Sequence, residues 1–267
     1  MGFLQPDGAA CDYGWCQHGR SRLAFRGPAL VLGGAHVLAI GGNGTFGRGV
    51  VAPFPALLAR RLGLPVANLG IANAGPDVFL GDEGVAELMA GAAVTVIEVL
   101  GAINLSNRYY TVHPRRNDRF LSASPALHAL YPGVDFTEFN FTRHMLSTLA
   151  DRDPGAFCEV AAHLRTTWER RMTALLDHCR ARPVLLHLRG PSDGTATPCR
   201  PGIEPLLVND AMIARISGRA DRVVRVDVIN HPSGDSDRPD GPDGPGQADH
   251  LGVAEALAPV LAELLRA

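Results

Sequence analysis

Short apolar runs recur along the chain, and most of them end next to a glycine, an asparagine or a charged residue. Runs of about four to eight such residues, rich in valine, isoleucine and leucine, are typical of strands buried on both faces of a parallel sheet. The pattern predicts five strands, at residues 36–41, 65–69, 93–100, 183–188 and 222–229.

Apolar residues at helical spacing lie between these runs. The first such stretch has Pro53 in its first turn and Gly63 directly after its last, which are typical start and stop signals. Two segments lack periodicity: residues 101–140, and residues 230–247, whose Gly, Pro and Asp content predicts a mobile loop. The helices are expected at 53–62, 76–89, 141–149, 155–181, 208–218 and 249–265.

Strands that alternate with helices predict an α/β protein, a three-layer α/β/α sandwich with a five-stranded parallel sheet of the flavodoxin type. We expect one domain over 1–267, with an N-terminal extension at 1–30 and a central insertion or lid at 101–140. Ligands of such sheets bind outside the carboxyl ends of the strands, so the loops that follow the strands are where a site is expected.

Charge and composition exclude several functions. The chain has 25 basic and 27 acidic residues, so we expect neither a nucleic-acid nor a membrane partner. Every basic residue is arginine, which excludes a P-loop lysine and a Schiff-base lysine; we expect no cofactor.

No secretory signal is evident, so we expect a cytoplasmic protein with reduced cysteines. Cys11, Cys16 and His18 form at most a metal half-site, and we expect no metal.

A glycine-rich turn, Gly-Gly-Asn-Gly-Thr-Phe-Gly at 41–47, follows the first predicted strand. Such a turn before a helix can bind an anion through backbone N–H groups, which makes Gly42 and Thr45 candidate ligand-binding residues. The Thr45 hydroxyl has an alternative role as a helix cap.

This turn resembles the first block of the SGNH (GDSL-like) hydrolases, Gly-Asp-Ser-x-Thr-x-Gly between a strand and a helix. Gly42 stands at the position of the aspartate and Asn43 at that of the nucleophilic serine. The second block resembles residues 68–77, where Asn73 stands at the position of the oxyanion-hole glycine. The third block resembles residues 101–104, where Asn104 stands at the position of the oxyanion-hole asparagine.

The last SGNH block, Asp-x-x-His, is not present in register. His250 has Gln247 three residues before it, and His231 has Asp227 four residues before it, so both are imperfect candidates. The resemblance implies the SGNH fold and the candidate catalytic residues Asn43, Asn73, Asn104 and His250.

The centre of the chain carries a closer resemblance. Residues 107–120, which contain His-Pro-Arg-Arg-Asn-Asp-Arg-Phe, together with 135–139 and 141–144, resemble an uncharacterised bacterial domain family without an assigned activity. In that family threonine stands where this chain has Asn43. The resemblance therefore points away from a serine esterase.

Several cationic side chains follow the third predicted strand. Guanidinium groups favour bidentate contacts with carboxylate, phosphate or sulfate, so we expect an anion clamp that covers or borders the crevice. The alternative is a solvated loop whose arginines pair with nearby carboxylates. His113 and His144 are candidates for a general base, although His144 lies in a helical pattern. The residues of the expected clamp are Arg108, His113, Arg115, Arg116 and Arg119.

Two classes of function remain open from the sequence. The first is an SGNH-like domain with a degenerate catalytic site, a pseudoenzyme that binds an acidic or glycan-type small molecule; Gly42, Asn43 and Gln247 favour it. The second is an esterase or acyltransferase that acts on a polar or carbohydrate ester through non-standard residues. A different chemistry in the same crevice is a third alternative, and the oligomeric state is open. Either way, we expect Asn43, Asn73 and Asn104 to meet at one crevice, because each follows a strand.

Overall fold

The computed structural model describes residues 3–4, 10–11, 13–190, 205–229 and 244–267. The loop predicted at 230–247 lies outside the described residues as far as position 243, and so does His231. A short antiparallel pair, β1 (Phe3–Leu4) with β2 (Ala10–Cys11), lies near the N-terminus.

The centre of the molecule is a parallel sheet of five strands in the order β4-β3-β5-β8-β9. The first strand of this sheet lies between the second and the third, which is the flavodoxin-like order that the sequence predicts. Every residue of β3, β4 and β5 is buried, which accounts for their mainly apolar sequences. The strands are β3 (Val37–Gly41), β4 (Val66–Gly70), β5 (Val94–Glu98), β8 (Pro183–Arg189) and β9 (Arg222–Asp227).

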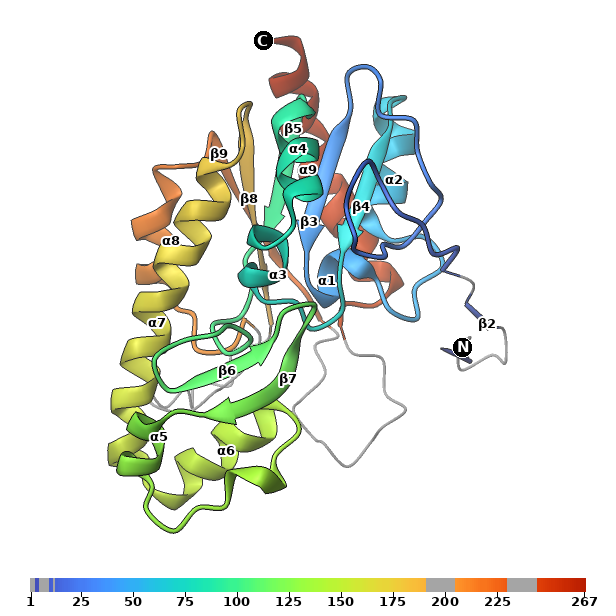
Figure 1. Ribbon diagram of the computed structural model, residues 1–267. Coiled ribbons are helices and arrows are strands. Elements are labelled where there is room, and N and C mark those ends of the chain that lie inside the picture. Colours follow the sequence, from blue (N-terminus) through green and yellow to red (C-terminus); the bar gives the residue numbers. More distant parts are fainter. Residues whose placement is uncertain (1–2, 5–9, 12, 191–204, 230–243) are drawn as a thin grey trace.

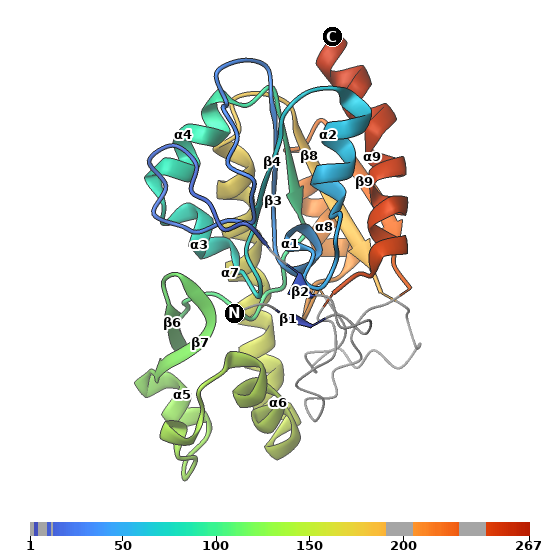
Figure 2. The ribbon, with the colours of Figure 1, turned by 90° about the vertical axis from the view of Figure 1, so that its right-hand side faces the viewer.

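Helices cover both faces of this sheet, as Figure 2 shows. One face packs against α2 (Phe54–Leu62) and α9 (Gln247–Arg266) through a cluster that includes Leu58 and Leu257. The other face lies under α3 (Pro76–Leu80), α4 (Glu83–Gly91), α7 (Pro154–Asp177) and α8 (Asp210–Ser217).

The single helix predicted at 76–89 is wrong. The chain leaves the helix after Leu80 and starts again at Glu83. Asp82 begins the second helix, because its carboxylate accepts a hydrogen bond from the backbone N–H of Val85 at 2.9 Å.

The central insertion is an ordered group of elements beyond one end of the sheet (Figure 1). Its hairpin has register shifts, which explains why its sequence shows no clean alternation. Side chains of the insertion, including Tyr110 and Phe120, belong to the same buried cluster as Leu38 and Ile40 of the sheet. The elements within 101–140 are β6 (Tyr110–His113), β7 (Arg116–Ala123), α5 (Pro125–Leu130) and the 3-10 helix η1 (Phe136–Glu138). Helix α6 (Thr142–Arg152) follows them.

The cysteines differ from the expectation of five reduced thiols. Cys16 and Cys179 are free, whereas Cys158 on α7 is disulfide-bonded. Spacing along a sequence does not reveal which cysteines approach each other in space, so this bond was not predictable. Cys16 Sγ lies 3.6 Å from His18 Nε2, and no group of three or more candidate metal ligands occurs among the described residues.

Within the same residues, none of the helices has both the length and the apolar character that a membrane crossing requires.

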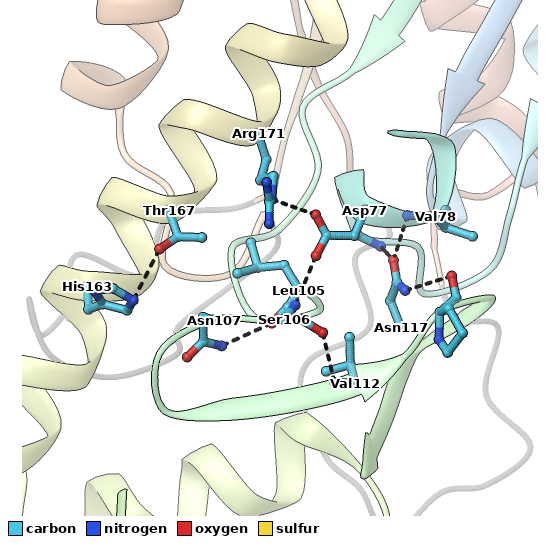
Figure 3. A network of polar contacts seen from close by, with 12 residues as sticks. Asp77, Val78, Leu105, Ser106, Asn107, Val112, Asn117, His163, Thr167 and Arg171 are labelled. Atoms are coloured by element: carbon cyan, nitrogen blue, oxygen red, sulfur yellow. Dashed lines mark hydrogen bonds and ion pairs between the residues drawn. The ribbon is translucent and has the colours of Figure 1, made fainter. Parts of the chain in front are cut away.

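A polar network joins the hairpin to the rest of the protein (Figure 3). The buried side chain of Asn117 accepts hydrogen bonds from the N–H groups of Gly75 and Val78 at the start of α3, at 3.3 and 3.1 Å. Its amide nitrogen donates to the carbonyls of His113 and Pro114 in the hairpin turn, at 3.0 and 3.3 Å. One side chain therefore fixes the hairpin turn against the loop that follows β4.

Nearby, Asp77 joins the same hairpin region to α7. One carboxylate oxygen lies 2.8 Å from Arg171 Nε, and the other accepts from the N–H of Ser106 at 3.0 Å. The hydroxyl oxygen of Ser106 in turn accepts from the N–H of Val112 at 3.1 Å. Figure 3 shows these contacts as one continuous set.

We expect Asn117→Ala to lower the free energy of unfolding by about 2–4 kcal/mol, because it leaves several buried backbone groups without partners. The matched control is Asn140→Ala, at an exposed position of the same insertion, which should stay within about 0.5 kcal/mol of the wild type. Urea unfolding of the three proteins measures the difference. Equal stability of both variants would show that the network does not hold the hairpin.

Candidate functional site

The three asparagines meet at the carboxyl ends of β3, β4 and β5, as predicted. Asn43 Nδ2 donates to Asn73 Oδ1 at 2.8 Å, and the backbone N–H of Asn73 donates to Asn43 Oδ1 at 3.0 Å. Asn104 Nδ2 donates to the carbonyl oxygen of Asn73 at 2.9 Å. The positional argument from the strand ends is therefore confirmed for these side chains.

Asn43 is the first residue of α1 (Asn43–Phe46), the short helix that follows β3. Its reciprocal pair with Asn73 occupies the place where the SGNH resemblance puts a nucleophile. A carboxamide has no hydroxyl or thiol to attack an ester, and the backbone N–H expected in the oxyanion hole is already bonded to Asn43. Asn43 therefore lacks the hydroxyl that the resemblance places at this position, and the N–H of Asn73 is bonded within the protein.

Asn73 has a left-handed backbone, with φ of +56°, which asparagine adopts more readily than most residues. The bonds from Asn43 and Asn104 hold it in that conformation. The Thr142 hydroxyl donates to Asn104 Oδ1 and so attaches α6 to the same network. The amides are thus fixed from four separate segments of the chain.

Glu98, the last residue of β5, lies buried beneath the glycine-rich turn. One of its oxygens accepts from the N–H groups of Gly42 and Thr45 at 2.9 and 2.8 Å, and from the Thr45 hydroxyl at 2.6 Å. The N–H groups of the turn therefore bind a carboxyl group, but that group is a side chain of the protein. The N–H groups of Gly42 and Thr45 are thus bonded to Glu98, and the Thr45 hydroxyl donates to the same carboxyl group and does not cap the helix.

Two glycines of the turn, Gly41 and Gly44, leave room for this carboxyl group and its neighbours. A Cβ at Gly41 would lie 2.2 Å from a Glu98 oxygen, and one at Gly44 would lie 2.7 Å from the other. Side chains at these positions would displace the carboxylate. Glu98 was not among the residues predicted from the sequence, although an acidic residue inside a mainly apolar strand was the available signal.

Burial raises the pKa of Glu98, because desolvation disfavours the charged form. Hydrogen bonds from Thr45, Gly42 and Gly44 oppose this effect without overcoming it. The group is therefore a titratable carboxyl on the wall of the site.

A cavity of about 520 Å³ opens beside the asparagines. Its walls come from the ends of β3 and β5, the loop after β4, α6, and the segment before α9. Polar side chains on the walls include Asn43, Asn73, Glu98, Asn104, Asp118, Arg143, His144 and Ser147. Phe141 contributes an aromatic ring that is 43% exposed.

The expected arginine clamp does not line this cavity. Arg108 lies over the ring of Tyr109, and Arg116 is exposed on β7. Arg115 lines a different cavity, and Arg119 reaches only the rim, where its guanidinium lies 5.6 Å from the centre of the Phe141 ring. The hairpin was not predicted from the sequence, and it determines where the arginine side chains that it carries point.

His113 also has a local role. Its Nδ1 accepts from the N–H groups of Arg115 and Arg116, both at 3.2 Å, and so shapes the hairpin turn. The cation that does line the cavity is Arg143, on the cavity-facing side of α6. Sequence reasoning missed Arg143 because it lies in an ordinary helical pattern.

His250 is not among the residues that line the cavity. It is buried on α9, where its Nδ1 accepts from the backbone N–H of Phe54 at 3.0 Å. Burial, with Arg26 nearby, lowers its pKa to about 4. A neutral histidine that holds the start of α2 has a structural role, and the imidazole on the cavity wall is His144.

We expect Glu98→Gln to change how stability depends on pH. Because the folded state raises the pKa above its ordinary value of 4.5, wild-type stability is lost as pH rises from that value through the folded pKa. Glutamine can still accept from the turn but does not ionise, so the variant should gain stability relative to the wild type over that window. Urea unfolding between about pH 4 and 8 measures the difference. If the free energies of unfolding of the two proteins differed by the same amount at every pH, this result would contradict the raised pKa of Glu98.

Solved structures to which this chain is similar include the following three esterases. A carbohydrate esterase family 2 enzyme of Corynascus thermopiles has a TM-score of 0.46 and 14% identity, over 90% of this chain and 69% of that one. A carbohydrate acetylesterase family member of Sinorhizobium meliloti has a TM-score of 0.44 and 14% identity, over 88% of this chain and 100% of that one. A catalytic mutant of the acetylxylan esterase Axe2 of Geobacillus stearothermophilus has a TM-score of 0.42 and 12% identity, over 87% of this chain and 94% of that one.

A search of curated proteins finds no match to the chain. A family model, by contrast, matches residues 1–265, which is nearly the whole sequence. The chain therefore belongs to the family described as Domain of unknown function (DUF6473).

Proposed function

We propose that the protein binds an acidic carbohydrate-type small molecule in the asparagine cavity and does not hydrolyse it by a serine mechanism. The observation that carries this proposal is the reciprocal Asn43–Asn73 pair in the place of a nucleophile. A site that keeps its pocket but exchanges the attacking hydroxyl for a bonded amide retains recognition and loses the usual chemistry.

Arg143 supports the acidic character of the ligand. Its side chain is half-buried on the cavity wall, and no carboxylate of the described residues forms an ion pair with it. An unpaired guanidinium in a cavity gains charge-assisted hydrogen bonds from a carboxylate, sulfate or phosphate group. Glu98 and Asp118 lie on the same walls, so the anionic group of the ligand is expected next to Arg143 and away from them.

The remaining walls suit a sugar. Asn43 and Asn104 each use one amide hydrogen within the network, which leaves the second for ligand hydroxyl groups. Phe141 presents a partly exposed ring, against which the C–H face of a sugar packs. A volume of about 520 Å³ lies within the range of ordinary small-molecule sites.

An esterase or acyltransferase is the second candidate, and one observation favours it. Ser147 and His144 lie three residues apart on α6 and both line the cavity, so a hydroxyl and an imidazole face the same space. Among the described contacts, no hydrogen bond joins these two side chains. A general base must be within hydrogen-bond reach of its nucleophile, so this pair is less well arranged than the binding groups.

We expect Arg143→Gln to weaken the binding of glucuronate about tenfold or more, because one charge-assisted contact is lost. Glucose, which has no carboxylate, should bind the variant and the wild type equally. The matched control is Arg116→Gln, an exposed arginine of β7 that does not line the cavity. Isothermal titration calorimetry at low salt provides the dissociation constants. Unchanged glucuronate binding by Arg143→Gln would contradict the acidic-ligand proposal.

We also expect the wild-type protein to remain unlabelled by a fluorophosphonate probe and to leave short-chain nitrophenyl esters intact. Both reagents require an activated hydroxyl, and the structure has an amide at position 43. Mass spectrometry of the treated protein measures labelling. A label on Ser147 that disappears in a His144→Ala variant would support the esterase instead.

A further inference from the structure

A second cavity, of about 490 Å³, lies between the N-terminal segment, α3 and the hairpin turn. It shares no lining residue with the asparagine cavity. Arg22 lies on one wall and Arg115, from the hairpin turn, lies on another. Figure 3 shows the polar network that borders this space, with Asn117 between the hairpin and α3.

The two acidic side chains of this cavity already have partners. Asp77 has Arg171 Nε at 2.8 Å on one oxygen and the N–H of Ser106 at 3.0 Å on the other. Asp82 accepts from the N–H groups of Val85 and Arg22, at 2.9 and 3.0 Å. Each carboxylate oxygen therefore has a donor, and the negative charge of Asp77 is offset by a guanidinium.

The two arginines of this cavity lack the ion pairs that some other arginines of the described residues form. Arginines such as Arg20 and Arg215 form ion pairs with glutamates. For the side chains of Arg22 and Arg115, by contrast, the described residues provide no ion-pair partner, although both face one cavity. The position of Arg115 is defined, because Asn117 and His113 hold the backbone of its turn. Two unpaired guanidinium groups on a shared cavity attract an anion.

The rest of the lining selects the kind of anion. Leu23, Val78 and Val112 are buried apolar residues on the walls, and the Ser106 hydroxyl, which accepts from Val112, keeps its own hydrogen for a ligand. A mainly apolar body with one anionic group would satisfy these walls better than a bare inorganic ion.

From these contacts we propose that this cavity is a second binding site, for a small organic anion with a carboxylate or phosphate-monoester group. Arg22 and Arg115 hold the anionic group from two sides, and the apolar walls hold its body. The site is separate from the asparagine cavity and independent of the function proposed for it.

Phenyl phosphate is a suitable probe, with phenol and inorganic phosphate as its two halves. We expect calorimetry at low salt to detect phenyl phosphate binding to the wild type, with both halves binding at least about tenfold more weakly. Arg22→Gln and Arg115→Gln should each weaken phenyl phosphate about tenfold or more. Both arginines are exposed, so the variants should melt at the wild-type temperature.

Two matched variants locate the binding. Arg116→Gln removes the neighbouring arginine of the same turn, and Arg143→Gln removes the cation of the asparagine cavity; both should bind phenyl phosphate as the wild type does. No binding to the wild type, or undiminished binding to Arg22→Gln and Arg115→Gln, would overturn the proposal. A loss confined to Arg143→Gln would also overturn it, because the anion would then occupy the asparagine cavity. Inorganic phosphate that binds as tightly as phenyl phosphate would refute the organic class of ligand.

Discussion

The candidate site depends on one buried carboxylate. Glu98 takes hydrogen bonds from the backbone and side chain of the turn after β3, and so fixes the residue that this turn presents to the cavity. The carboxylate leaves no room for a Cβ at Gly41 or Gly44, which accounts for the glycines around Asn43. Its own strand, β5, is central in the sheet, so the turn is attached to the most buried part of the fold. Without these hydrogen bonds, the turn and Asn43 would no longer be held in place.

The hydrogen bonds beside Glu98 hold the asparagine side chains in fixed positions. Asn43, Asn73 and Asn104 bond to one another and are reached by Thr142 from α6, so their amides are fixed before a ligand arrives. Preorganised donors bind a polar ligand at a smaller entropic cost than mobile ones do. The same bonds occupy the groups that an acyl-transfer reaction would need, because the backbone N–H of Asn73 is already donated to Asn43. The proposed binding function therefore rests on one set of contacts, which fixes the amides and places an asparagine where the resemblance puts a nucleophile.

The sequence predicted those features that depend on periodicity and on strand ends. Mainly apolar runs identified all five strands of the main sheet, and the convergence of Asn43, Asn73 and Asn104 followed from parallel topology. The hairpin at 110–123 was not predictable, because its irregular register removes the alternation that marks a strand. With the hairpin unknown, the directions of Arg115 and Arg119 were also unknown. His250 appeared catalytic by its order in the chain, whereas its burial and its bond to Phe54 are tertiary properties.

The most direct test follows binding and turnover in one sample. The asparagine side-chain amides of the protein are labelled with ¹⁵N. The labelled protein is mixed with an O-acetylated glucuronate, and NMR spectra are recorded over hours. The account predicts that the amide signals of Asn43 and Asn104 shift on addition of the ligand, while the acetyl ester signal keeps its intensity. Accumulation of free acetate above the rate in protein-free buffer, or amide signals that do not move at saturating ligand, would contradict it.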